Sequence, residues 1–238
     1  MPRAAEQNLT SSSEKKTIDT ELKTMDYSLY LVTDRGLSKG RSTLEIVQAA
    51  VRGGVTCVQL REKNCSTREF IGQALSVKDF LKQHNIPLII NDRVDVAQAV
   101  QADGVHLGQS DMPCKTARAI LKDSMIIGIS AETLEHAAEA EKDGADYVGA
   151  GPLFFTATKT DLAPILGLEG LREIRKTVKI PVVGIGGINI NNAEDFIRNG
   201  ADGIAVVSAI VSADDPEKSA SDLRKIMKIR KNPSYTKQ

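Results

Sequence analysis

The sequence predicts an α/β protein that folds as a single (β/α)8 TIM barrel. Three observations support this prediction. Short apolar runs rich in Val, Ile and Leu alternate with amphipathic segments, and eight such pairs follow one another along the chain. Runs of this composition are typical of parallel strands that are covered on both faces. Units of about 25 residues, repeated eight times, have the length of a closed barrel.

The apolar runs predict strands within residues 28–34, 57–63, 87–92, 104–109, 125–130, 147–153, 181–187 and 203–209. Apolar residues at three- and four-residue spacing predict helices within 43–54, 67–85, 93–101, 114–123, 133–144, 168–178 and 191–200. A last helix, within 216–231, begins with a proline in its first turn. An open doubly wound sheet is the alternative. It would need fewer strands and usually a glycine-rich fingerprint after the first strand, where this chain reads "VTDRGLSKG".

A repeated junction supports the count of eight units. The segments "RGGVTCVQL", "QADGVHLG", "DGADYVGAG" and "NGADGIAVV" share one pattern, in which a helix ends at Gly or Ala-Asp and an apolar strand follows at once. Glycine tolerates the left-handed conformation that ends many helices. Short turns from helix to strand are typical of alternating β and α units.

Composition excludes several classes of protein. The 238 residues are 41% hydrophobic and 26% charged, and 31 basic residues balance 31 acidic ones, which argues against a nucleic-acid partner. No apolar run approaches the roughly 18 residues of a membrane helix, so no membrane partner is expected. Three cysteines without metal-site spacing predict reduced thiols in a cytoplasmic protein.

The ends of the chain are predicted to lie outside the barrel. Residues 1–26 are polar and mixed in charge, and we expect a disordered N-terminal tail there. An organelle address is the weaker alternative, because acidic residues interrupt the segment. The barrel domain is expected to span residues 27–230, followed by a C-terminal tail at 231–238.

The end of the second predicted strand carries polar residues on one face. Side chains alternate along a strand, so one face presents Cys57, Gln59, Arg61 and Lys63. Val58 and Leu60 point the other way and can pack under the helices. Two cations and an amide that converge at the barrel mouth predict an anion clamp. The alternative is a salt-bridged strand end with Glu62 as the partner.

Two aspartates follow the next strands. Asp92 comes directly after Asn91 at the end of the third strand, and Asp111 lies in the loop after the fourth. Two carboxylates that face two cations favour one magnesium ion per subunit, carrying a phosphate-rich ligand. In isolation, each aspartate could equally be a helix cap. His106 is interpreted as a packed or hydrogen-bonded core histidine, because no second His or Cys near it suggests zinc.

The later strand ends are suited to binding a phosphate. The turns after the seventh and eighth strands contain Gly186, Gly187, Val207 and Ser208. In many barrels these turns hold phosphate on backbone N–H groups, and glycine lets the backbone approach the anion closely. Ser130 ends the fifth strand. A long loop after the sixth strand carries Thr156, Thr158 and Lys159, and it is either a cover for the site or a plain surface loop.

The ordered set "QLREK", "IIND", "GVHLGQSD", "GIS", "TATKT", "VVGIGGI" and "VVSAI" resembles the thiamine-phosphate synthase family over residues 28 to about 228. The resemblance implies a transferase that joins 4-amino-2-methyl-5-(diphosphooxymethyl)pyrimidine to a thiazole ethyl phosphate. The products would be thiamine phosphate and pyrophosphate. The small molecules would be its partners, and the sequence leaves open whether the protein is a homo-oligomer.

The resemblance also implies roles for individual residues. The pyrimidine diphosphate would contact Gln59, Leu60, Arg61, Glu62, Lys63, Asn91, Ser130 and Lys159, of which Arg61, Lys63, Ser130 and Lys159 would be catalytic. The thiazole phosphate would contact Thr156, Ala157, Thr158, Gly187, Val207 and Ser208. Magnesium would use Asp92 and Asp111. A thiazole tautomerase-like barrel and a non-catalytic barrel that binds thiamine precursors are the alternatives, and neither would require the two aspartates.

Overall fold

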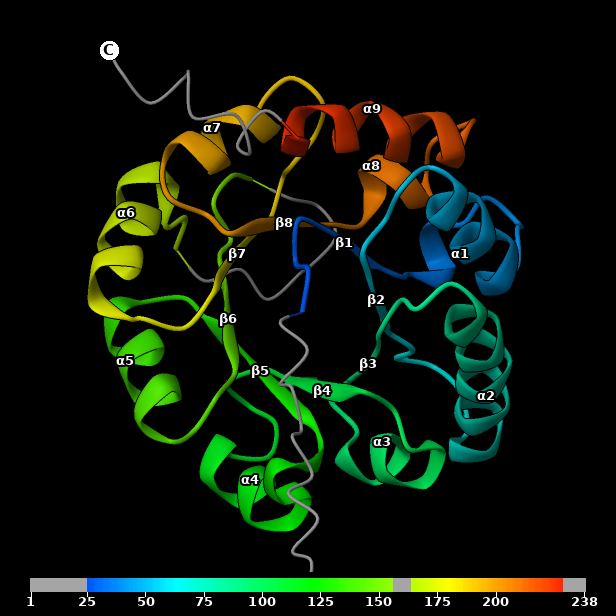
Figure 1. Cartoon of the computed structure of the whole chain (residues 1–238), viewed down its shortest axis with the longest axis horizontal. Coiled ribbons are helices and arrows are strands. Elements are labelled where there is room, and N and C mark those ends of the chain that lie inside the picture. The colour runs from blue at the N-terminus through cyan, green and yellow to red at the C-terminus, as the bar shows by residue number, and fades with distance from the viewer. Residues whose placement is uncertain (1–24, 156–163, 229–238) are drawn as a thin grey trace, which may run out of the picture.

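The computed structural model describes residues 25–155 and 164–228. Eight parallel strands close into a barrel in chain order, because β1 pairs with β2 on one side and with β8 on the other. Figure 1 shows the helices as a ring around these strands. The predicted (β/α)8 barrel is therefore confirmed, and the open doubly wound sheet is wrong.

The strands are β1 (Leu29–Val32), β2 (Cys57–Leu60), β3 (Leu88–Asn91), β4 (Gly104–Leu107), β5 (Ile126–Ala131), β6 (Tyr147–Ala150), β7 (Val182–Ile185) and β8 (Gly203–Val206). The helices are α1 (Thr43–Arg52), α2 (Thr67–Gln83), α3 (Val94–Val100), α4 (Cys114–Leu121), α5 (Leu134–Lys142), α6 (Gly167–Thr177), α7 (Ala193–Arg198), α8 (Ser208–Val211) and α9 (Pro216–Lys228). The single turn of α8, directly after β8, was not predicted from the sequence.

Two layers of buried side chains follow from the alternation along each strand. Val58 and Leu60 belong to the outer layer, between the strands and the helices. Cys57 belongs to the smaller cluster inside the barrel. The members of that inner cluster are Tyr27, Tyr30, Val32, Cys57, Ile89, Tyr147, Val183 and Ala205. The faces predicted for the second strand are therefore confirmed.

The four junctions that share a sequence pattern also share a hydrogen-bond pattern. The residue before each even-numbered strand bonds twice with one residue of the preceding strand. Its backbone N–H donates to that residue's carbonyl, and its side-chain oxygen accepts that residue's N–H at 2.7–3.1 Å. The pairs are Thr56 with Leu29, Asp103 with Leu88, Asp146 with Ile127, and Asp202 with Val182.

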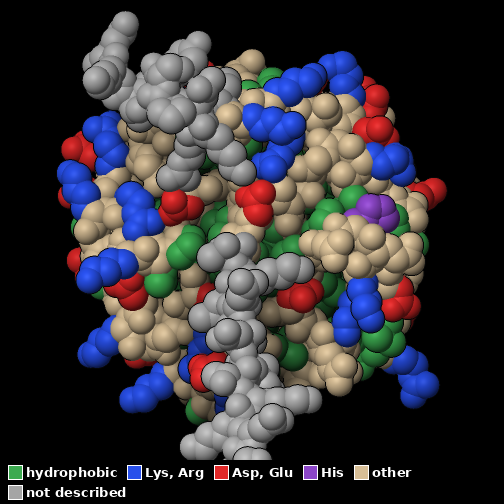
Figure 2. Space-filling view, viewed as in Figure 1, with side chains coloured by type: hydrophobic (Ala, Val, Ile, Leu, Met, Phe, Trp, Pro, Cys, Tyr) green, Lys and Arg blue, Asp and Glu red, His purple; other side chains and the backbone are tan. Residues whose placement is uncertain are grey.

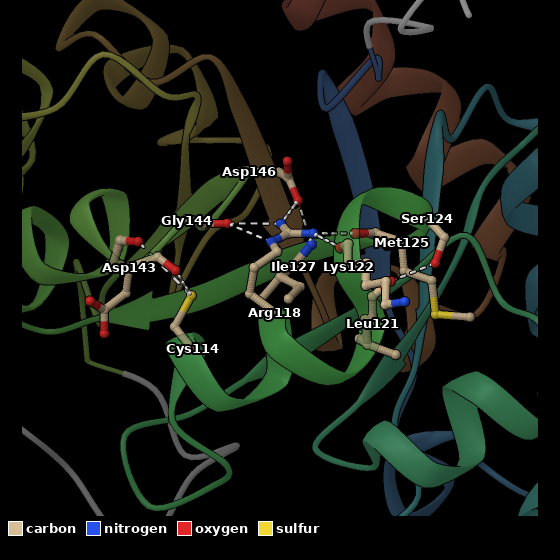
Figure 3. Close-up of polar contacts among 11 residues, drawn as sticks. Cys114, Arg118, Leu121, Lys122, Ser124, Met125, Ile127, Asp143, Gly144 and Asp146 are labelled. Carbon is tan, nitrogen blue, oxygen red and sulfur yellow. Dashed lines mark hydrogen bonds and ion pairs between the residues drawn. The ribbon is translucent and has the colours of Figure 1, made fainter.

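A long cationic side chain lies over each of these junctions. Arg118 of α4 lies over Gly144, donates to three backbone carbonyls and pairs with Asp146, as Figure 3 shows. The equivalent residues on the other even-numbered units are Lys78 of α2, Arg175 of α6 and Arg224 of α9. Arg175 and Arg224 lie over Gly200 and Gly54, which both have a positive φ. Lys78 donates to the carbonyl of Val100, and the next residue, Gln101, also has a positive φ. The barrel thus repeats a two-strand unit four times.

The other features of the surface agree with the composition. On the face shown in Figure 2, basic and acidic side chains are interspersed around the periphery. Among residues 25–155 and 164–228, no helix is long and apolar enough to span a membrane. Met25 packs against the inner cluster and Asp26 bonds with Ser28 and Arg224, so both belong to the barrel. The rest of the two predicted tails lies outside the described residues and stays a prediction.

Arg118→Met should lower the free energy of unfolding by about 2–4 kcal/mol, because several hydrogen bonds from one charged, largely buried group are lost together. Urea denaturation measures this loss. Arg198→Met is the matched control, since Arg198 is exposed and, among the described residues, its side chain bonds to Glu194 one turn away in the same helix. Equal losses in the two variants would contradict a structural role for Arg118.

Candidate active site

A cavity of about 400 Å³ opens at the carboxyl ends of the strands, where (β/α)8 barrels place their active sites. Most of the predicted site residues line it. They are Gln59, Arg61, Lys63, Asn91, Asp92, Asp111, Ser130, Gly187, Val207 and Ser208. Thr156, Ala157, Thr158 and Lys159 lie outside the described residues. Their predicted contacts stay predictions.

Both cations of the predicted clamp lie at the mouth, and each is paired with a carboxylate. Arg61 Nη1 lies 2.7 Å from Asp34 Oδ2, and the side chains of both residues are mostly buried. Lys63 Nζ lies 2.5 Å from Asp92 Oδ2. The partner of Arg61 is therefore Asp34 rather than Glu62. Sequence reasoning missed Asp34, although it ends the first apolar run, in "VTD", two residues after β1.

Leu60 and Glu62 do not line the cavity. The Leu60 side chain is fully buried in the outer layer, on the opposite face of β2 from Gln59. Glu62 accepts a hydrogen bond from Thr43 at 3.4 Å, and burial raises the pKa of its carboxyl. The contacts predicted for these two residues with a pyrimidine diphosphate would have to come largely from their backbone, and they stay predictions.

Asp92 and Asp111 form a close pair of carboxylates. Asp92 has a φ of 63°, in the left-handed region, and its N–H donates to the carbonyl of His106 at 2.8 Å. Asp111 Oδ2 accepts the N–H of Gly108 at 2.7 Å. Partial burial raises the pKa of Asp111, and the neighbouring Asp92 carboxylate raises it further. The strands thus hold two like charges together at a point that Lys63 also reaches.

This pair suits a divalent cation. Magnesium in phosphate-binding sites typically uses one or two carboxylates, and substrate oxygens and water complete its coordination. Within the part of the chain that the structure describes, no group of three or more His, Cys, Asp or Glu side chains is placed to hold a metal. Among the described residues, the carboxylates Asp92, Asp111 and Glu132 and the cations Arg61 and Lys63 line the cavity. A divalent cation held by the two aspartates would offset part of this negative charge.

The floor of the cavity is neutral. Tyr30, Gln59 and Tyr147 are buried inside the barrel and hydrogen-bonded to one another or to His106. Burial raises the pKa of both tyrosines well above the ordinary value, so both hydroxyls stay protonated. His106 is a hydrogen-bonded core residue, as predicted, but it also lines the cavity. Sequence reasoning missed the two tyrosines.

Glycines make room for this floor. A Cβ on Gly128 would lie 2.1 Å from Tyr147 Cζ, and a Cβ on Gly149 would lie 3.1 Å from His106 Cε1. These positions of β5 and β6 therefore face large rings inside the barrel. The sequence shows both glycines, but it does not show the rings that they face.

Gly128→Ala should lower the free energy of unfolding by about 1–3 kcal/mol, because the Tyr147 ring must shift to accept the methyl group. Gly72→Ala is the matched control. Gly72 lies in α2 with nothing within 4 Å of its added Cβ, so this variant should gain about 0.5–1 kcal/mol from helix propensity. Thermal or urea denaturation gives both values. An unchanged or higher free energy of unfolding for Gly128→Ala would contradict the prediction and show that the Tyr147 ring accommodates the methyl group.

A second end of the cavity is formed after β7 and β8. Gly186 and Gly187 have φ values of 101° and 69°, which favour glycine. A Cβ on Gly187 would lie 2.7 Å from Phe154 Cβ, so the turn leaves no space for a side chain. Val207 and Ser208 begin the single turn of α8, whose first N–H groups have no partner within the helix. This arrangement suits an anion bound by backbone donors.

The fold and the cavity define a (β/α)8 enzyme class whose site combines a neutral floor with a charged mouth. Comparison with known proteins identifies the family. The family model described as thiamine monophosphate synthase matches residues 29–210. A thiamine-phosphate synthase of Chloroflexus aurantiacus is 54% identical over 86% of this chain and 94% of its own. One of Methanocella arvoryzae is 48% identical over 85% and 96%.

A solved structure agrees with these relatives. The thiamine phosphate pyrophosphorylase of Pyrococcus furiosus is 46% identical and covers 86% of this chain and 97% of its own, with a TM-score of 0.80. The chain belongs to the thiamine monophosphate synthase family, a family of transferases.

Proposed function

We propose that this protein joins 4-amino-2-methyl-5-(diphosphooxymethyl)pyrimidine to a thiazole ethyl phosphate and releases pyrophosphate. The observation that carries the proposal is one cavity with a charged mouth, a floor of buried tyrosines and a glycine-rich turn suited to a phosphate. The chain also has relatives named thiamine-phosphate synthase that it matches over nearly their whole length. Both substrates are small anionic molecules, and the cavity offers a separate place for each anionic group.

The reaction breaks one bond and forms another. The C–O bond between the pyrimidine methylene carbon and the diphosphate breaks, and its electron pair leaves with pyrophosphate. The aminopyrimidine ring releases electrons toward the carbon left behind. The lone pair of the thiazole nitrogen then forms the new C–N bond. No oxidant or reductant is needed, and little acid–base help is required.

The residues of this chain act mainly by stabilising and holding charge. Arg61 and Lys63, which line the mouth, would bind the leaving diphosphate, and Ser130, which lines the cavity, would donate to it. Asp92 and Asp111 would hold Mg²⁺, which supplies positive charge against the diphosphate when it is bound. The turn at Gly187 and Ser208 would hold the thiazole phosphate, and so orient its nitrogen toward the carbon. Lys159 is proposed to add a further cation.

Release of pyrophosphate, measured with both substrates and Mg²⁺, tests the proposal. We expect pyrophosphate and thiamine phosphate to appear in equal amounts, and neither to appear when one substrate is omitted. Binding of both compounds without turnover would favour a non-catalytic barrel. A change in the thiazole substrate alone, without pyrophosphate, would favour a tautomerase. Either outcome would overturn the proposed reaction.

The metal site gives a sharper prediction. Asp92→Asn or Asp111→Asn should lower kcat at limiting Mg²⁺ by at least about tenfold, which is about 1.4 kcal/mol of barrier. The melting temperature of Asp111→Asn should not fall, because the variant removes repulsion from Asp92 and keeps an oxygen for the Gly108 N–H. Asp222→Asn, which changes a carboxylate of an exposed ion-pair cluster, is the control for kcat. Full activity of either site variant at limiting Mg²⁺ would remove the metal assignment.

A further inference from the structure

We propose that the side chains on the cavity floor form a hydrogen-bonded network in which each group donates to the next, from Gln59 to Ser130. The hydroxyl hydrogen of Ser130 is then available to the substrate. We further propose that Tyr147 is the positioning residue at the centre of this network. The kinetic part of this inference rests on the proposed function, and the part that concerns proton positions does not.

The network is continuous across the barrel. Gln59 Nε2 lies 3.1 Å from the Tyr30 hydroxyl, and that hydroxyl lies 2.9 Å from the hydroxyl of Tyr147. The Tyr147 hydroxyl lies 2.9 Å from His106 Nδ1. His106 Nε2 lies 3.0 Å from Ser130 Oγ. Four links therefore join five side chains that come from β1, β2, β4, β5 and β6.

The hydrogens follow one direction once the first two links are set. An amide nitrogen can only donate, so Gln59 donates to Tyr30. The Tyr30 hydroxyl also bonds with the Cys57 thiol, and we infer that it directs its single hydrogen to Tyr147. Tyr147 then directs its own hydrogen to His106 Nδ1. A singly protonated imidazole then carries its hydrogen on Nε2 and donates to Ser130 Oγ. The hydroxyl hydrogen of Ser130 is the one left over, and it is free to meet an acceptor atom in the cavity.

The opposite direction has a different consequence. If the Gln59 amide presented its oxygen to Tyr30, every donor and acceptor would exchange roles, and Ser130 would donate its hydroxyl hydrogen to His106 Nε2. The cavity would then see only an acceptor at Ser130. The position of one ring proton on His106 therefore decides which kind of substrate atom Ser130 can bind.

Tyr147 connects the two halves of this hydrogen-bonded network. In the network of five side chains described above, its hydroxyl is the link between Tyr30 and His106, and neighbouring groups hold its ring in place. The Tyr27 ring lies 4.7 Å away between centroids, and Gly128 leaves space only for the tyrosine. Full burial keeps water from replacing the hydroxyl as a partner of His106.

Nitrogen NMR of the full chain with labelled histidine tests the direction. The protein has three histidines, so His106→Gln assigns the signal of interest. At neutral pH we expect the hydrogen on Nε2 and a bare Nδ1. A hydrogen on Nδ1, or on both nitrogens, would overturn the proposal. This result does not depend on activity, so it stays informative even if the proposed reaction were wrong.

A double-mutant cycle tests whether Tyr147 acts through Ser130. Tyr147→Phe should lower kcat/KM for the pyrimidine diphosphate by about tenfold in the natural chain, as the loss of one hydrogen bond predicts. In the Ser130→Ala background the same change should cost less than about twofold, since the affected bond is already absent. Tyr27→Phe removes a hydroxyl beside the network and should change kcat/KM by less than about twofold. Equal losses from Tyr147→Phe in both backgrounds would show a merely structural tyrosine and overturn its positioning role.

Discussion

The paired hydrogen bonds at the start of the even-numbered strands are the constraint on which the rest of the barrel depends. Most strands have only four residues, so a slip of one residue would turn every side chain to the opposite face. Gln59 would then point under the helices, and Leu60 would point into the cavity. Thr56, Asp103, Asp146 and Asp202 each hold both backbone groups of one residue on the preceding strand, and this fixes the register of a strand pair. The site at the other end of the strands inherits its geometry from these bonds.

The cationic side chains over the junctions close the ring as well as stabilise each unit. Arg118 and Arg175 act within about 30 residues of chain, over the turns that begin with Gly144 and Gly200. Arg224 instead reaches from the last helix to Gly54 and Asp26 near the start of the barrel. The helices α1 and α9 also meet closely, because a Cβ on Gly53 would lie 2.4 Å from a backbone oxygen of α9. A cationic side chain over a helix-to-strand junction therefore also joins the last helix to the start of the barrel.

The sequence was sufficient for the parts of the site that depend on local patterns. The period of two along the second strand predicted that Gln59 and Leu60 face opposite layers, and the strand ends located Asp92 and Asp111. Contacts across the barrel could not be found in this way. Tyr30 and Tyr147 are 117 residues apart, and nothing near either of them in sequence points to the other. The ion pair of Arg61 with Asp34 also joins two different strand ends, whereas the neighbour in sequence, Glu62, had been the candidate partner.

The depth of each group in the cavity follows from the cost of burying charge, and this orders the whole site. A full charge inside the barrel would lose its hydration, and the floor holds the two protonated tyrosines and the Gln59 amide, hydrogen-bonded to one another or to His106. The charged groups lie at the mouth, where Lys63 is half exposed and its pairing with Asp92 can be exchanged at small cost. We therefore expect the pyrimidine diphosphate to bind with its neutral ring toward Tyr147 and its diphosphate toward Lys63. In the proposed reaction, that orientation leaves the diphosphate at the opening, from which it can depart without crossing the floor.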